Sequence, residues 1–71
     1  MTLAEARTGQ KCRIVACNAT GKARARLDSL GLVEDETVRV LSASFAGLIV
    51  DIKGSRLAIC KEAARQLEVT V

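Results

Sequence analysis

Three cysteines carry most of the reactive chemistry in this 71-residue chain: Cys12, Cys17 and Cys60. Thiolates bind soft and borderline metal ions well, but a closed structural zinc site needs four ligands, and the chain has no histidine to complete one. Cys17 and Cys60 fall on the outer side of the strands predicted below, so weak Fe(II) or Zn(II) binding by these two thiols stays open. Cys12 alternates with apolar residues and is predicted to be a small buried side chain. No built-in cofactor is expected.

Basic residues gather in the first half of the sequence. Through Gly31 there are six basic and two acidic residues, which gives +4, whereas the remainder has five basic and six acidic residues, which gives −1 and the total of +3. Such an asymmetry favours docking on an acidic protein surface or near anionic lipid headgroups, and it is equally typical of a solvated face that keeps a small protein soluble. The candidate partner-binding cations are Lys11, Arg13, Lys22, Arg24 and Arg26, which would form one basic patch if the helix predicted below packs over that end of the strand.

Phe45 is the single aromatic residue of the chain, and it lies in the apolar loop segment Phe45-Ala46-Gly47. If its ring is exposed, Phe45 is a natural anchor for a partner's groove. The alternative is that the ring folds back and caps the core.

The composition excludes most enzyme mechanisms. The chain has no histidine to act as a base, and no nucleophile is paired with a base in a recognisable arrangement, so we expect no enzymatic activity. With one aromatic residue it also lacks the stacking platforms of proteins that bind single-stranded nucleic acids. Seventy-one residues fit one domain, residues 1–71, whose thin stability margin leaves a weak homo-oligomer open.

The odd number of cysteines, without a CxxC pair, is typical of a protein from a reducing compartment. No secretory signal begins the sequence, and the longest apolar run, Phe45 to Val50, is too short to cross a membrane. We expect a cytoplasmic protein that is peripheral to the inner membrane at most.

Short strands separated by turn residues dominate the pattern, with alternating apolar positions or a glycine turn between two apolar runs. The predicted strands are 11–17, 37–43, 48–53, 56–60 and 67–71. The dipeptide Gly54-Ser55 predicts a two-residue type II′ hairpin turn. Five short strands favour a sheet curled into a small barrel, which leaves few open edges.

Three helical segments complete the pattern. Thr2-Leu3-Ala4-Glu5 matches a capping box, which predicts a single turn, and residues 61–66 favour another short turn. Between the first two strands, Ala23, Leu27 and Leu30 form an apolar stripe on a helix of about ten residues. Gly31 in Leu-Gly-Leu is predicted to be the left-handed cap of this helix, and Gly54 to be a second structural turn.

Several motifs in this order resemble the FeoA family, ferrous iron transport protein A, over essentially the whole chain. They are Arg26-Leu27 with Leu30-Gly31-Leu32, then Gly54 followed by Leu57-Ala58-Ile59. The chain departs from the family at Glu34-Asp35, where a Pro-Gly turn is common, and at Cys60, where a basic residue is common. The resemblance implies a small SH3-like barrel with a helix inserted after the first strand.

The same resemblance implies a function in bacterial ferrous iron uptake. FeoA proteins are thought to act as non-enzymatic accessories on the cytoplasmic side of the membrane transporter FeoB. The sequence leaves two alternatives open: a transition-metal sensor or chaperone that uses its cysteines, and a small barrel that binds nucleic acid. We expect FeoB as the partner and no nucleic acid.

Overall fold

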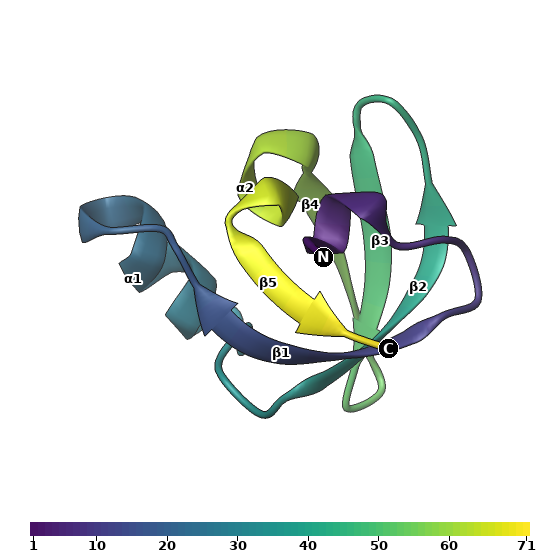
Figure 1. The fold of residues 1–71 in the computed structure, drawn as a ribbon, viewed down its shortest axis with the longest axis horizontal. Coiled ribbons are helices and arrows are strands. Elements are labelled where there is room, and N and C mark those ends of the chain that lie inside the picture. The colour runs from purple at the N-terminus through teal and green to yellow at the C-terminus, as the bar shows by residue number, and fades with distance from the viewer.

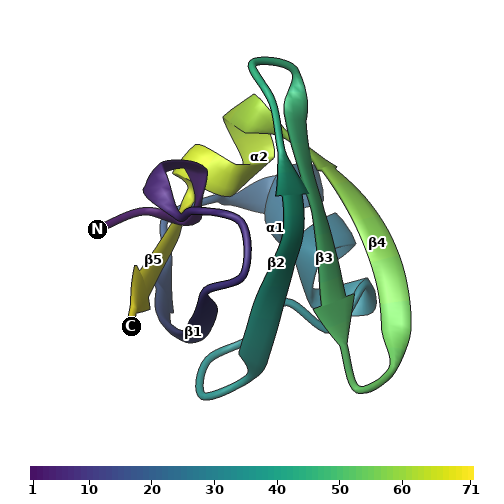
Figure 2. The same ribbon diagram turned by 90° about the vertical axis from the view of Figure 1, so that its right-hand side faces the viewer.

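Five antiparallel strands form the body of the computed structural model, which describes all 71 residues. The strands are β1 (Lys11–Cys17), β2 (Thr37–Ala43), β3 (Gly47–Ile52), β4 (Ser55–Cys60) and β5 (Leu67–Thr70). They pair in the order β4-β3-β2-β1-β5. β1 and β5 curl over the face of the sheet made by β2, β3 and β4 (Figure 2). This confirms the predicted mainly β, SH3-like barrel.

The curl of the sheet has a local cause in two of its strands. The register shifts between Ile14 and Ala16 where β1 pairs with β5, and between Val40 and Ser42 where β2 pairs with β3. An extra residue on one strand bends it and increases its right-handed twist. β1 and β2 bend at these points, which lets one five-stranded sheet enclose a core.

Alternate strand positions supply most of the core. On β1, Cys12 and Ile14 are buried, as predicted, and Cys12 lies opposite Val38 of β2. No polar or charged residue is buried. The sixteen buried residues are Leu3, Ala6, Cys12, Ile14, Ala19, Leu27, Leu32, Val38, Val40, Leu48, Val50, Ile52, Ile59, Ala64, Leu67 and Val69.

Three helical segments accompany the sheet: η1 (Leu3–Glu5), α1 (Gly21–Ser29) and α2 (Lys61–Arg65). η1 is the predicted single turn, where the Glu5 carboxylate accepts hydrogen bonds from the backbone N–H of Thr2 at 2.9 Å and from its hydroxyl at 3.2 Å. The backbone bond, followed by the hydroxyl bond, lowers the pKa of Glu5 below its usual value. None of the helices has the length and apolar character needed to cross a membrane.

Gly31 ends α1 as predicted, with a left-handed φ of 88°. The N–H of Leu32 donates to the carbonyl of Leu27 at 3.0 Å, and the N–H of Gly31 donates to the carbonyl of Asp28 at 3.0 Å. These two bonds are the Schellman pattern, and the fully buried Leu32 supplies its apolar contact. The cap therefore ties the end of α1 to the core.

Two turns differ from the expectations. The β3–β4 hairpin turns at Lys53-Gly54, one residue earlier than the predicted Gly54-Ser55, because Ile52 pairs with Ser55. Lys53 and Gly54 have φ values of 51° and 86°, so the turn is type I′ rather than II′. In the acidic turn, Asp35 takes a φ of 69°, which provides the left-handed residue that the family's Pro-Gly turn would provide.

The two edges of the sheet are treated differently. On the β5 side, the N-terminal segment covers the edge: the N–H of Val69 donates to the carbonyl of Met1 at 2.8 Å, and Thr2 pairs with Glu68. On the β4 side, no further strand or segment pairs with the sheet. β4 is therefore the one open edge.

Alanine substitutions at Gly31 and Gly47 test two different glycine requirements. Gly31 has open space around it and needs only its positive φ, so Gly31→Ala should cost about 1 kcal/mol of unfolding free energy. A Cβ at Gly47 would collide with the backbone carbonyl oxygen of Ile59, so Gly47→Ala should cost clearly more. Urea unfolding measures both.

D-alanine at position 31, introduced by chemical synthesis, is the matched control because it adds the same methyl group in a conformation that favours positive φ. It should leave stability at or above that of the parent. A loss equal to that of the L-alanine variant would contradict the conformational explanation.

Candidate docking groove

α1 is attached to the barrel by few side chains. Leu27 is its only buried residue, whereas Ala23 is exposed and Leu30, which follows the helix, is half-buried. The predicted apolar stripe therefore exists, but one member alone enters the core. Figure 1 shows α1 standing at one end of the molecule, beyond the end of β1.

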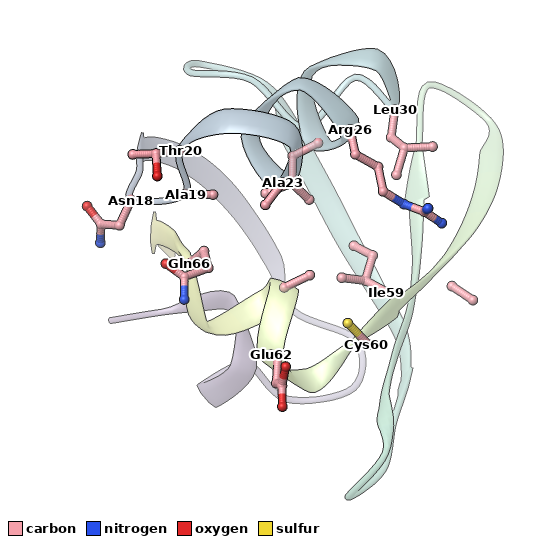
Figure 3. A pocket seen from close by; sticks show the side chains of 13 residues that line it. Asn18, Ala19, Thr20, Ala23, Arg26, Leu30, Ile59, Cys60, Glu62 and Gln66 are labelled. Atoms are coloured by element: carbon pink, nitrogen blue, oxygen red, sulfur yellow. The ribbon is translucent and has the colours of Figure 1, made fainter.

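A groove opens between α1 on one side and β4 with α2 on the other. Its volume is about 670 Å³. The thirteen lining residues, most of them apolar, are Asn18, Ala19, Thr20, Ala23, Arg26, Leu27, Leu30, Ala58, Ile59, Cys60, Glu62, Ala63 and Gln66. Figure 3 shows α1 above the groove and α2 below it, with Ile59 and Cys60 between them. An exposed hollow with this apolar lining is a candidate for contact with apolar groups of a partner.

The charged groups of the groove stand on opposite walls. Arg26 comes from α1 and Glu62 from α2 (Figure 3), and neither forms an ion pair within the chain. Both charges are thus available to a bound group. An apolar floor between a free cation and a free carboxylate suits a segment with apolar and charged side chains better than a purely apolar one.

The α1 part of the predicted basic patch is exposed and unpaired. Lys22, Arg24 and Arg26 are all solvent-exposed, and none forms an ion pair. Arg24 contacts the backbone only, with its Nη1 3.5 Å from the carbonyl oxygen of Cys17. α1 therefore carries three free positive charges, of which Arg26 lines the groove.

The β1 part of the predicted patch lies elsewhere. Lys11 begins β1 and Cys17 ends it, so about 20 Å of extended strand separates Lys11 from the connection to α1. The guanidinium of Arg13 is engaged by Asp35, with Nη1 and Oδ1 3.0 Å apart. The five cations do not gather in one patch, because α1 projects from the far end of β1 instead of packing back over the strand (Figure 1).

Phe45 lies in the β2–β3 connection with 94% of its surface exposed. The prediction that it caps the core is wrong, since the sixteen-residue core is complete without it. Its backbone neighbour Ala46 accepts a hydrogen bond from the N–H of Lys61 at 3.1 Å, which holds the loop next to the start of α2. The exposed ring is consistent with the alternative, a partner anchor, which stays a prediction.

Cys12 is buried and Cys60 is exposed, as predicted, whereas Cys17 is half-buried and packs against the core because the register shift between Ile14 and Ala16 breaks the alternation of β1. Burial raises the pKa of the Cys12 thiol. Cys60 lines the groove, whereas Cys17 pairs with Leu67 at the end of β1. No three His, Cys, Asp or Glu side chains come together as metal ligands. Metal binding by Cys17 and Cys60 stays a prediction, without a third ligand beside them.

The groove itself was not predicted from the sequence, because its walls come from three separate segments. A signal was present in α1, which has four charged residues among its nine and one large apolar side chain. A helix with so little apolar surface cannot bury a whole face against a sheet. Nothing in the sequence around Ala58 or Gln66 indicated that these residues line a groove.

These features define a small SH3-like barrel with an inserted helix and a mostly apolar surface groove. The family model described as FeoA domain matches residues 1–71. The chain belongs to the FeoA family, which is associated with ferrous iron transport.

Solved structures support the same assignment. A crystal structure of an iron uptake regulatory protein (FeoA) has 33% sequence identity and a TM-score of 0.92, covering 97% of this chain and 93% of that one. The FeoA protein of Chlorobium tepidum has 28% identity and a TM-score of 0.85, covering 100% of this chain and 70% of that one. No match was found among curated protein sequences.

A more distant likeness concerns the fold alone. ScaR, in a crystal structure with bound Zn²⁺, has 20% identity and a TM-score of 0.86 over 97% of this chain, which corresponds to 35% of ScaR. Iron(II) transport protein A from Clostridium thermocellum has 22% identity and a TM-score of 0.94 over all of this chain and 45% of that one. The same barrel thus occurs as part of longer chains.

Alkylation rates test the exposures of the three thiols. With iodoacetamide at pH 8, Cys60 should react first, Cys17 more slowly and Cys12 last, because burial both shields Cys12 and raises its pKa, which lowers its thiolate fraction. Mass spectrometry of peptides gives the order, and in urea the differences should disappear. Native Cys12 reacting as fast as Cys60 would contradict the core position.

Proposed function

We propose that this protein is a non-enzymatic accessory of bacterial ferrous iron uptake that acts in the cytoplasm by docking on the membrane transporter FeoB. The groove between α1 and α2 carries the proposal, since it offers an apolar surface lined by Arg26, one of three unpaired cations on α1. The FeoA family assignment supplies the iron-uptake context. FeoA domains are small accessory domains and form no known enzyme family, which supports a role through protein contact.

The groove and the cations make complementary contributions to docking. Apolar side chains in a groove slow dissociation once the complex has formed, whereas exposed charges chiefly accelerate the encounter and add salt dependence. Arg26 lines the groove, and the exposed Lys22 and Arg24 lie on the same helix, so α1 would meet an acidic partner surface first. The groove would then hold the apolar part of the contact.

Charge reversal on α1 tests this proposal. Tagged protein should retain FeoB from detergent-solubilised membranes of the native host, and the Arg24→Glu, Arg26→Glu variant should lose at least about tenfold of that retention at low salt. The matched control is Arg7→Glu, Lys11→Glu, which makes the same change in net charge at exposed positions away from α1. If both variants lost the same fraction of FeoB retention, the change in net charge would explain the loss and docking through α1 would be wrong.

Phe45→Ala separates an anchor from a structural residue. Because the ring is 94% exposed, the substitution should change the unfolding free energy by less than about 0.5 kcal/mol. If the ring anchors the partner, FeoB retention should still fall. Unchanged retention, with unchanged urea unfolding, would remove Phe45 from the docking surface.

A further inference from the structure

The register of the β3–β4 hairpin determines which backbone groups of β4 are free. The closing pair Ile52 and Ser55 flanks a two-residue turn, so the hydrogen-bonded pairs recur every second residue from Ser55. The N–H of Lys61 bonds to the carbonyl of Ala46 at 3.1 Å, which continues the same alternation. The N–H and C=O groups of Arg56 and Ala58, between these pairs, therefore point away from β3.

Nothing in the chain meets these outward groups. β4 pairs only with β3, and the backbone hydrogen bonds outside the helices and strands include neither Arg56 nor Ala58, both of which are solvent-exposed. Proteins usually blunt such an edge with charged side chains, proline, a bulge or a covering segment, and Arg56 is the one charged side chain on β4. β4 has no proline and pairs with β3 through six uninterrupted positions. The N-terminal segment covers the opposite edge, so β4 alone is left open.

The open edge borders the groove. Ala58, Ile59 and Cys60 contribute the β4 side of the groove, and Leu27 and Leu30 contribute the α1 side. A strand added to β4 would point every second side chain to the sheet face that Ile59 occupies. On that face the added side chains would meet the apolar groove.

The charges on the other face of the sheet, opposite to that of Ile59, favour a particular side chain on the added strand. Cross-strand register places Lys11 opposite Arg39, Arg39 opposite Asp51 and Asp51 opposite Arg56, which forms one row over four strands. The row has three cations and one carboxylate, and Arg56, at its open end, forms no ion pair. An acidic residue opposite Arg56 on a strand added to β4 would extend the row with the favourable sign.

We propose that β4 accepts an extended strand of a partner protein, with a carboxylate side chain opposite Arg56 and an apolar side chain in the groove against Leu27 and Leu30. Main-chain hydrogen bonds to Arg56 and Ala58 would supply the affinity. The carboxylate opposite Arg56 and the apolar side chain in the groove would supply the selectivity. This inference rests on the proposed function, because it names how the docked partner is held.

A proline at position 58 tests the added strand. Ala58→Pro removes an N–H that makes no bond within the chain, and an edge strand tolerates proline where its N–H faces outward. Ala58→Ser is the matched control because it keeps the N–H. Retention of FeoB from solubilised membranes should fall at least about tenfold for Ala58→Pro and stay near the parent's level for Ala58→Ser.

Hydrogen–deuterium exchange on the parent protein gives a second measurement that depends on no variant. In the free protein, the amides of Arg56 and Ala58 should exchange rapidly, since neither donates a hydrogen bond. In the complex with FeoB, exchange of the β4 peptide should slow by at least about tenfold, the factor that corresponds to about 1.4 kcal/mol. Protection of β4 together with loss of retention in Ala58→Pro supports strand addition.

Other outcomes overturn it in distinguishable ways. If the parent and both Ala58 variants retain FeoB equally and β4 stays unprotected, docking stands and strand addition is wrong. If no form of the protein retains FeoB, the proposed function fails and this inference fails with it. If sedimentation shows a dimer of the parent that Ala58→Pro abolishes, a second copy of this chain occupies the edge, and the partner strand is again wrong.

Discussion

The placement of α1 depends on how little apolar surface the helix can bury. The strands supply most of the core, the N-terminal segment, Ala19, Leu32 and α2 supply nearly all of the rest, and among the nine residues of α1 only Leu27 joins it. The Schellman cap at Gly31 and the buried Leu32 fasten the C-terminal end of the helix. Held at these points, α1 stands beside the barrel and leaves the groove between itself and α2. A helix with a complete apolar face would have closed that space.

The N-terminal segment has a corresponding effect at the other side of the sheet. Its pairing with β5 satisfies the backbone groups of that edge, while those of β4 stay open next to the groove. One molecule of this size thus combines a protected edge, an open edge and an apolar hollow with unpaired cations beside it. The open edge and the groove occur together on the surface beside α1, which is why we propose protein contact for that surface and not for the outer face of β1.

Periodicity predicted the elements well because each strand carries its own burial pattern. The bounds of β1 and β2 agree with the sequence, as do the turn at η1 and the cap at Gly31. The hairpin was misplaced by one residue because Gly54-Ser55 resembles a type II′ turn, whereas the pairing of Ile52 with Ser55 requires Lys53 to adopt a positive φ. Register between strands decides such a turn, and local composition alone does not contain it.

The sequence by itself determined the barrel, the inserted helix, the burial of Cys12 and the exposure of Cys60, because alternation and capping signals are local. Only the tertiary structure decided that Lys11 and Arg13 lie apart from the α1 cations, that Phe45 leaves the core, and that β4 is the open edge. Each of these depends on how segments distant in sequence are placed relative to one another. The local sequence patterns of α1 and β4 do not contain information on this relative placement.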